Sequence, residues 1–150
     1  MREIKFRAWD GNRMWFSGQE GEEDERGNTY QLYYDREAST YKASLLGPQF
    51  LVTNDPYPMY HPGDEVRCRL MQNTGLKDTN DIEIYEEDII STHKHDFVVK
   101  WDGIGGMYLF HEINNPDSGM DYYEFEENYS YYGFHVVGNT FENPELLEDK

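Results

Sequence analysis

Short runs of alternating apolar and polar residues, each ended by a turn signal, recur along this 150-residue chain. The longest such stretch is LMQNTGLKDTNDIEIYEEDII, from Leu70 to Ile90. It predicts a strand, a tight turn, a second strand, a second turn and the start of a third strand, because a period of two suits a strand with one buried face. No long segment shows the 3.6-residue period of an amphipathic helix. The sequence therefore predicts a fold that is all-β or nearly so.

Other segments share this alternation or a high content of β-branched and aromatic residues, which favour strands. The strands predicted from them cover residues 2–9, 13–16, 29–34, 41–46, 66–71, 97–101, 107–111 and 134–137. In the first of these the alternation places Ala8 on the buried face and Arg7 on the outer face. One short helix, Pro144 to Glu148, is expected to close the chain, because Asn143 precedes a proline suited to a first helical position. Short strands with turn-rich connections indicate a barrel or a pair of coiled antiparallel sheets.

The length and the proline distribution bear on domain organisation. A chain of 150 residues suits one domain. Residues 53–64 contain Pro56, Pro58 and Pro62, which cannot donate to a β-ladder or continue a helix. We predict a single domain, residues 1–150, in which a Pro-rich connector at 53–64 joins an N-terminal lobe, 1–52, to a C-terminal lobe, 65–150.

The net charge bears on the class of partner. The chain carries 30 acids and 13 lysines and arginines, for a formal net charge of −17, and 16% of its residues are aromatic. Duplex binding depends on cations that neutralise phosphates, so direct nucleic-acid binding is disfavoured. No run of about 18 apolar residues predicts a membrane span. Cys68 is the single cysteine, which excludes an intrachain disulfide. We expect a cytoplasmic protein with a tyrosine-rich surface.

Four segments together resemble the YopX family of phage and prophage proteins. They are the opening REIKFRAWD with MWF after it, the stretch from Leu70 to Ile90, VVKWD from Val98, and the tail VVGNTFENPELL. They occur in the family's order and span Arg2 to Leu147. The resemblance implies a small accessory protein in the cytoplasm of a bacterial host, with YopX-like coiled or barrel-like sheets. It implies no particular activity and no catalytic residues.

The chain departs from the family pattern at two turns. The pattern commonly has glycine where this chain has Asp81 and Glu87. Aspartate tolerates a left-handed backbone better than most residues, so the first turn is expected to persist. If the second turn requires a positive φ, Glu87 costs about 1 kcal/mol there. The hairpin is therefore expected to be retained, with the second turn altered.

A metal site is one hypothesis for the sequence His93-Lys94-His95-Asp96. In an extended segment His93 and His95 point the same way, so they could share a divalent ion with Asp96. The alternative is an exposed turn between two strands. Asp88 likewise has two interpretations, a catalytic carboxylate or a side chain that accepts backbone N–H groups of the turn at Glu86 and Glu87.

A second candidate site lies in DYYEFEENYSYYGF, residues 121–134. As a strand, this segment would direct one tyrosine of each pair inward and one outward, and outward tyrosines are enriched at protein interfaces. High β-propensity alone also explains the tyrosines. The candidate partner-binding residues are Tyr122, Tyr123, Glu124, Glu126, Glu127, Tyr131 and Tyr132.

Two functional hypotheses follow. The first is a non-catalytic phage or prophage accessory protein whose acidic, tyrosine-rich surface binds a host or phage protein with a basic face, in one version by DNA mimicry. The second is a metal-dependent hydrolase or nuclease that uses His93, His95 and nearby carboxylates. The sequence favours the first, because no catalytic spacing is present. It contains no cofactor motif, so we expect no cofactor, and it leaves homo-oligomerisation open.

Overall fold

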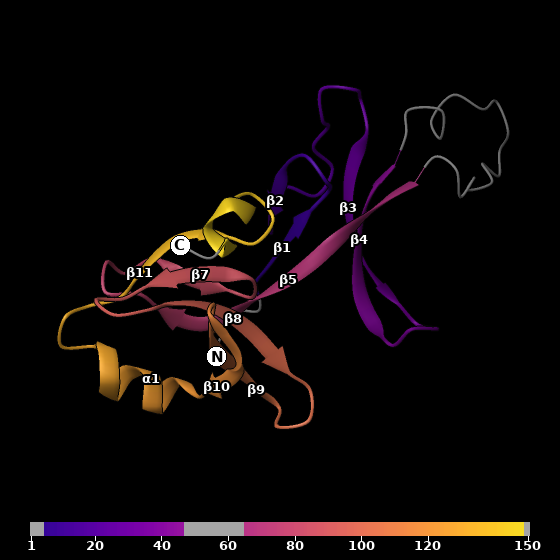
Figure 1. Ribbon diagram of the computed structural model, residues 1–150. Coiled ribbons are helices and arrows are strands. Elements are labelled where there is room, and N and C mark those ends of the chain that lie inside the picture. The colour runs from indigo at the N-terminus through magenta and orange to yellow at the C-terminus, as the bar shows by residue number, and fades with distance from the viewer. Residues whose placement is uncertain (1–4, 47–64, 149–150) are drawn as a thin grey trace, which may run out of the picture. The chain divides into compact units, whose positions relative to one another are not determined.

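The computed structural model describes residues 5–46 and 65–148, which consist largely of strands (Figure 1). The strands are β1 (Phe6–Trp9), β2 (Met14–Phe16), β3 (Thr29–Asp35), β4 (Thr40–Leu46), β5 (Glu65–Lys77), β6 (Glu83–Tyr85), β7 (Asp88–Ser91), β8 (Asp96–Asp102), β9 (Met107–Glu112), β10 (Asn115–Met120) and β11 (His135–Asn139). The helical segments are α1 (Tyr122–Tyr129) and the 3-10 helix η3 (Pro144–Leu147). The prediction of a nearly all-β fold is confirmed.

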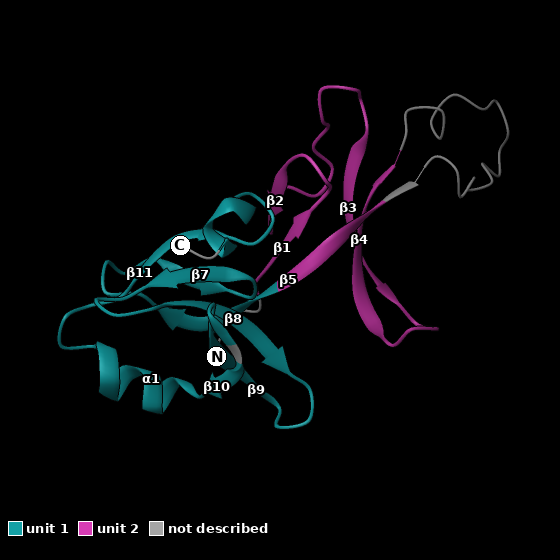
Figure 2. Ribbon diagram, viewed as in Figure 1, with its two compact units in different colours: residues 1–4, 72–150 teal, residues 5–71 magenta. Residues whose placement is uncertain are grey.

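The described residues form two compact units (Figure 2). One contains residues 5–46 and 65–71, and the other contains residues 72–148. The boundary falls within β5, between Met71 and Gln72. The Pro-rich connector predicted at 53–64 lies outside the described residues.

The first unit is a sheet with the strand order β2-β1-β5-β4-β3. Its core consists of Ala8, Trp15, Tyr30, Ala43 and Leu45. The Trp15 ring stacks on the Tyr30 ring with a centroid distance of 5.0 Å. Cys68 is half-buried and packs against this core, as its place in the alternation predicts.

The burial of Arg7 differs from what the alternation predicts. The pattern places its side chain on the outer face, but Arg7 is only 6% exposed. The reason is the position of β1 inside the sheet, between β2 and β5. Arg7 lies directly opposite Phe16 of β2, and side chains that are directly opposite on one face are close enough to cover each other.

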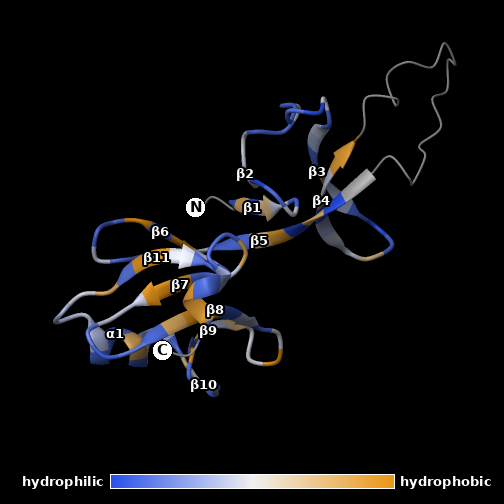
Figure 3. Cartoon of the chain, turned by 45° about the horizontal axis from the view of Figure 1, so that its top comes forward, coloured by the Kyte–Doolittle hydropathy of each residue, from blue (hydrophilic) through white to orange (hydrophobic). Residues whose placement is uncertain are grey.

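The second unit contains a five-stranded sheet with the order β10-β9-β8-β7-β11, together with β6, which pairs with the end of β5. Each neighbouring pair in it is antiparallel. The hydropathy colouring of Figure 3 shows the hydrophobic character of β7 and β8 at the centre of this sheet. The core residues are Ile84, Ile90, Phe97, Val99, Phe110, Phe125, Tyr129 and Phe134.

The two helical segments differ from the expectation. The helix predicted at the end of the chain is present as η3, with Pro144 at its start, but it is a 3-10 helix. The backbone carbonyl of Asn143 accepts from the Leu146 N–H at 3.0 Å, while no side-chain cap forms there. Helix α1 was not predicted. Neither helix of the described residues is long and apolar enough to cross a membrane.

Candidate protein-binding surface

Helix α1 is capped by Asp121, and the sequence around this residue contains a recognisable helix-start pattern. Asp121 has an extended backbone, and its Oδ1 accepts from the Glu124 N–H at 2.8 Å. An aspartate followed three residues later by a glutamate is a helix-start pattern, because the side chain satisfies an N–H group that the first turn leaves unpaired. This signal could have revealed α1 from the sequence.

The inner face of α1 rests on two aromatic residues four positions apart. Phe125 is fully buried and Tyr129 nearly so. The Phe125 ring stacks on Phe110 at 4.2 Å between centroids and meets Phe97 edge-on at 5.1 Å. With only these two side chains fully inward, the other helical residues face solvent or the rim, among them Tyr123, Glu124, Glu126 and Glu127.

The turn after α1 exposes two more tyrosines. The Gly133 N–H donates to the Tyr129 carbonyl at 3.1 Å, and Gly133 has a φ of +85°. A left-handed glycine at this place ends a helix. The turn leaves Tyr131 88% and Tyr132 67% exposed, so the expected split of one inward and one outward tyrosine is wrong for this pair. It does describe the other pair, because Tyr122 is half-buried and Tyr123 is 72% exposed.

His93 lies against this turn. Its ring is 4.3 Å from the Tyr132 ring and 5.8 Å from the Tyr129 ring, centroid to centroid. We call the exposed group formed by His93, Tyr123, Glu124, Glu126, Glu127, Tyr131 and Tyr132 the tyrosine–acid surface. It lies wholly within the second unit.

The other candidate metal ligands do not converge with His93. Residues 92–95 form a turn, in which the Thr92 N–H donates to the His95 carbonyl at 3.1 Å, so the segment is not extended. His95 Nδ1 lies 3.1 Å from a carboxylate oxygen of Glu112. Asp96 begins β8, opposite Ser91. Among the described residues, no group of three or more histidine, cysteine or acidic side chains is placed to hold a metal ion.

Acidic side chains dominate the part of the tyrosine–acid surface that residues 121–132 supply, whereas Lys94 is exposed next to His93. No lysine or arginine occurs from Asp102 to Asp149. Burial, together with the Glu126 carboxylate, raises the pKa of Tyr122. Burial and the Glu112 carboxylate raise the pKa of Tyr129 in the same way. Both phenols therefore stay neutral at physiological pH, and the charge of this region comes from its carboxylates.

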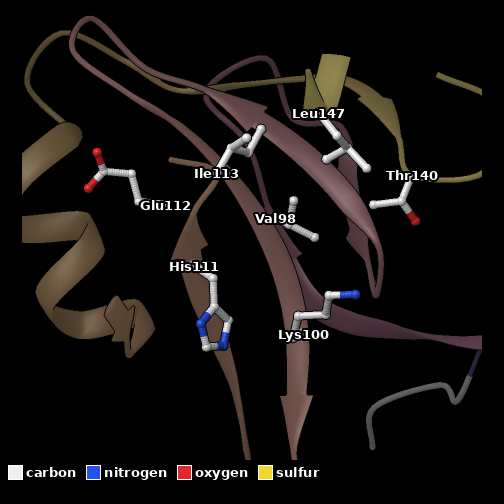
Figure 4. A pocket seen from close by; sticks show the side chains of 7 residues that line it. All are labelled: Val98, Lys100, His111, Glu112, Ile113, Thr140 and Leu147. Atoms are coloured by element: carbon white, nitrogen blue, oxygen red, sulfur yellow. The ribbon is translucent and has the colours of Figure 1, made fainter. Parts of the chain in front are cut away.

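The second unit also contains a pocket of about 310 Å³ near η3 (Figure 4). Val98, Ile113 and Leu147 give it apolar walls, and Lys100 and Thr140 lie at its rim. Figure 4 shows Glu112 pointing away from the other lining side chains. The Lys100 ammonium is bound to both carboxylate oxygens of Glu87, at 2.8 and 2.9 Å, so its charge is already neutralised.

Comparison with known proteins places this architecture in a family. The model of the YopX family, described as YopX protein, matches residues 5–148. The chain belongs to the YopX family. This confirms the resemblance of the four sequence segments.

A solved structure shares the YopX chain's fold. The crystal structure of protein EF1440 from Enterococcus faecalis matches with a TM-score of 0.57 and 24% sequence identity. The match covers 99% of this chain and 100% of that protein. A search of curated proteins found no match.

The YopX signature stretch works as a scaffold. Asp78 is buried, and its carboxylate accepts from the N–H groups of Asn80, Ile82 and Val136, each at 2.9 Å. Thr79 exchanges hydrogen bonds with the Phe134 backbone, from its own N–H and through its hydroxyl. These bonds tie the signature turn to a segment more than 50 residues later, and this segment follows the exposed tyrosines.

Both departures from the YopX pattern have the backbone that glycine would favour. Asp81 has a φ of +66° and Glu87 a φ of +70°. Glu87 gains contacts that a glycine could not make, because its carboxylate also accepts from the Thr140 hydroxyl at 2.7 Å, besides Lys100. The turn at Glu87 therefore has the positive φ that glycine favours, and its side chain links β8 to the segment before η3.

Asp88 is structural. It is 1% exposed, and its Oδ2 accepts from the Tyr85 N–H at 2.7 Å. The carboxylate thus holds the turn between β6 and β7, one residue earlier than the Glu86 and Glu87 groups expected. Asp78, Glu87 and Asp88 of the signature thus hold turns or link segments, and the tyrosine–acid surface lies outside the signature.

Proposed function

We propose that this YopX-family chain is a non-catalytic accessory protein that binds a host or phage protein with a basic face. Its binding region is the tyrosine–acid surface. The observation that carries the proposal is the exposure of Tyr123, Tyr131 and Tyr132, at 72, 88 and 67%, in a segment without lysine or arginine.

Exposed tyrosines are well suited to contribute binding free energy when a partner covers them. Each carries a large, rigid contact area with few rotatable bonds, which keeps the entropic cost of binding low. Here a hydrogen-bonded turn and a short helix hold them, so the contact area is already ordered. Exposed aromatic groups on a protein surface are a recurring sign of an interaction site.

The acidic side chains favour the approach and binding of some partners over others. A field of one sign attracts oppositely charged surfaces and raises association rates, and it disfavours acidic partners. The same charge disfavours a nucleic acid as the direct ligand. The partner is therefore a protein with clustered lysine and arginine, and a DNA-handling protein is one example. Both proteins meet in the cytoplasm of the bacterial host.

The hydrolase hypothesis gains no support from the arrangement of its candidate ligands. His93 lies on Tyr132 and His95 contacts Glu112, so the two imidazoles serve separate contacts. We therefore favour binding over catalysis.

Quantitative affinity capture from bacterial cells tests the proposal. The wild-type chain is compared with Tyr131→Ser/Tyr132→Ser, and with Tyr34→Ser as a control, because Tyr34 is exposed on the other unit. Nuclease treatment removes proteins bridged by nucleic acid. We expect a basic protein that is recovered with the wild type and the control and is depleted about ten-fold with the double variant. Equal recovery with all three chains would contradict the proposal.

A further inference from the structure

A second hollow lies beside the start of α1, within the second unit. Its volume is about 420 Å³. Trp101 of β8, Met107 and Tyr108 of β9, and Asp121 and Tyr122 at the start of α1 line it. We call it the α1 pocket. One of its lining residues, Asp121, accepts from the backbone N–H of Glu124, which belongs to the tyrosine–acid surface.

Part of its wall is aromatic, beside Gln72, Thr74 and Leu76 of β5. The Trp101 and Tyr108 rings are 4.8 Å apart between centroids and inclined at 63°, so they form a corner. Trp101 is 51% exposed, which is unusual for so large an apolar side chain. The negative faces of tryptophan and tyrosine attract cations, and this attraction strengthens when water is excluded.

Asp121 adds a carboxylate to the lining of the pocket. Asp121 Oδ1 accepts from the Glu124 N–H, and within the described part of the chain Oδ2 has no hydrogen bond. No lysine or arginine lines the pocket. Burial raises the pKa of Tyr122, so this phenol is neutral at physiological pH, and Asp121 is the one acidic residue among the described residues that line the pocket.

We propose that the α1 pocket binds a positively charged side chain, arginine or lysine, of a partner protein. The cation lies in the corner of Trp101 and Tyr108 and faces the Asp121 carboxylate. This inference rests on the proposed function, because it names the group by which a basic partner is anchored. Its test uses a defined probe and requires no knowledge of the partner.

The probe is a capped pentapeptide, Gly-Gly-Arg-Gly-Gly, acetylated and amidated to remove its terminal charges. Its binding to the full chain is followed by NMR through the Trp101 indole N–H signal. A citrulline peptide of the same shape lacks the positive charge and serves as the matched control. We expect the citrulline peptide to bind about ten-fold more weakly, because it loses both the cation–π attraction and the charge-assisted hydrogen bond.

Two variants locate the site. Asp121→Asn removes the charge but keeps a good helix cap, and Trp101→Leu removes the aromatic wall but keeps an apolar side chain. Each substitution is expected to weaken binding of the arginine peptide about five-fold. Binding to Asp121→Asn is followed through the Trp101 indole signal, and binding to Trp101→Leu through the Gly106 amide signal. Asp117→Asn is the control, because Asp117 is an exposed acid on β10 that does not line the pocket; we expect it to bind as the wild type does.

Equal binding of the arginine and citrulline peptides, or unchanged binding by both variants, would overturn the proposal. Tighter binding of tetramethylammonium than of the arginine and lysine peptides would also overturn it, because the ligand would then be a small quaternary ammonium. These failures leave the proposed function standing if capture still depends on Tyr131 and Tyr132. Conversely, a loss of that dependence with intact peptide binding would contradict the proposed function alone.

Discussion

Glu87 has a backbone conformation that residues with a side chain disfavour, and yet its own carboxylate accepts three hydrogen bonds. Its φ of +70° lies in the left-handed region. Its carboxylate binds the Lys100 ammonium and the Thr140 hydroxyl. Strain of about 1 kcal/mol is thus offset by a partly buried ion pair and a hydrogen bond of similar size.

This balance predicts an unusual order of stability at position 87. Glu87→Ala loses the contacts and keeps the strain, so it is expected to lower the free energy of unfolding by about 1–2 kcal/mol. Glu87→Gly loses the same contacts but relieves the strain, and should be about 1 kcal/mol more stable than the alanine variant. Urea denaturation measures both. A glycine variant less stable than the alanine variant would show that the turn carries no strain.

Tyr30 gives a prediction at high pH. Burial, with smaller effects of Glu20 and Cys68, raises the pKa of its phenol above the usual range. The folded chain therefore favours the neutral form, so the contribution is fully present below the unfolded pKa of about 10 and is lost as pH rises further. Tyr30→Phe should weaken this alkaline loss of stability, measured by urea denaturation between pH 8 and 11.

The same substitution has an effect at neutral pH. Among the described residues, the buried Tyr30 hydroxyl has no hydrogen-bond partner. Removing a buried polar atom that lacks a partner should raise the free energy of unfolding by about 1 kcal/mol, while the stacking on Trp15 persists. A loss of stability on Tyr30→Phe would indicate that the hydroxyl has a partner in the folded chain.

At the scale of elements, α1 depends on its cap and on two buried rings. Asp121→Ala removes the acceptor for the Glu124 N–H and should cost about 1 kcal/mol, whereas Asp121→Asn should cost less than half of that. Urea denaturation with circular dichroism measures the difference. Equal losses for the two variants would mean that the charge of Asp121, and not its hydrogen bond, supports the helix.

Most strands could be predicted from the sequence because each has its own local pattern. Strand β10 was missed, because NPDSGM shows neither alternation nor β-branched residues and contains a proline and a glycine. The alternation around β5 and the turn residues at 78–81 sufficed to place the signature turns. Helix α1 was missed because only Phe125 and Tyr129 are fully buried, which is too little for a 3.6-residue period, and because its tyrosines favour strands. The burial of Arg7 depends on which strands flank β1, and the sequence around it does not contain that information.

The sequence predicted which residues make up the candidate site but not how they are arranged. The tyrosines and acids of residues 121–132 were identified, and their partner-binding role stays a prediction. What the sequence could not show was the left-handed turn at Gly133, which exposes both Tyr131 and Tyr132. The α1 pocket was missed altogether, because its walls come from β5, β8, β9 and the start of α1, which are far apart in the sequence.

At the scale of the whole molecule, the net charge of −17 opposes the compact state by self-repulsion. Salt screens this repulsion, because the Debye length falls from about 30 Å at 0.01 M to about 3 Å at 1 M. The free energy of unfolding should therefore rise by roughly 1 kcal/mol between 0.01 and 0.5 M NaCl. Urea titrations at several salt concentrations measure this, and a decrease would show that native ion pairs outweigh the repulsion.

Site-specific photocrosslinking tests the central claim, that the tyrosine–acid surface binds a basic protein. Benzoylphenylalanine replaces Tyr131 in one chain and Tyr34, on the other unit, in a second, and both are irradiated in bacterial cells. We expect position 131 to yield a discrete adduct with a protein rich in lysine and arginine, and position 34 to yield none. An adduct of equal yield at both positions, or an adduct only at position 34, would contradict the account.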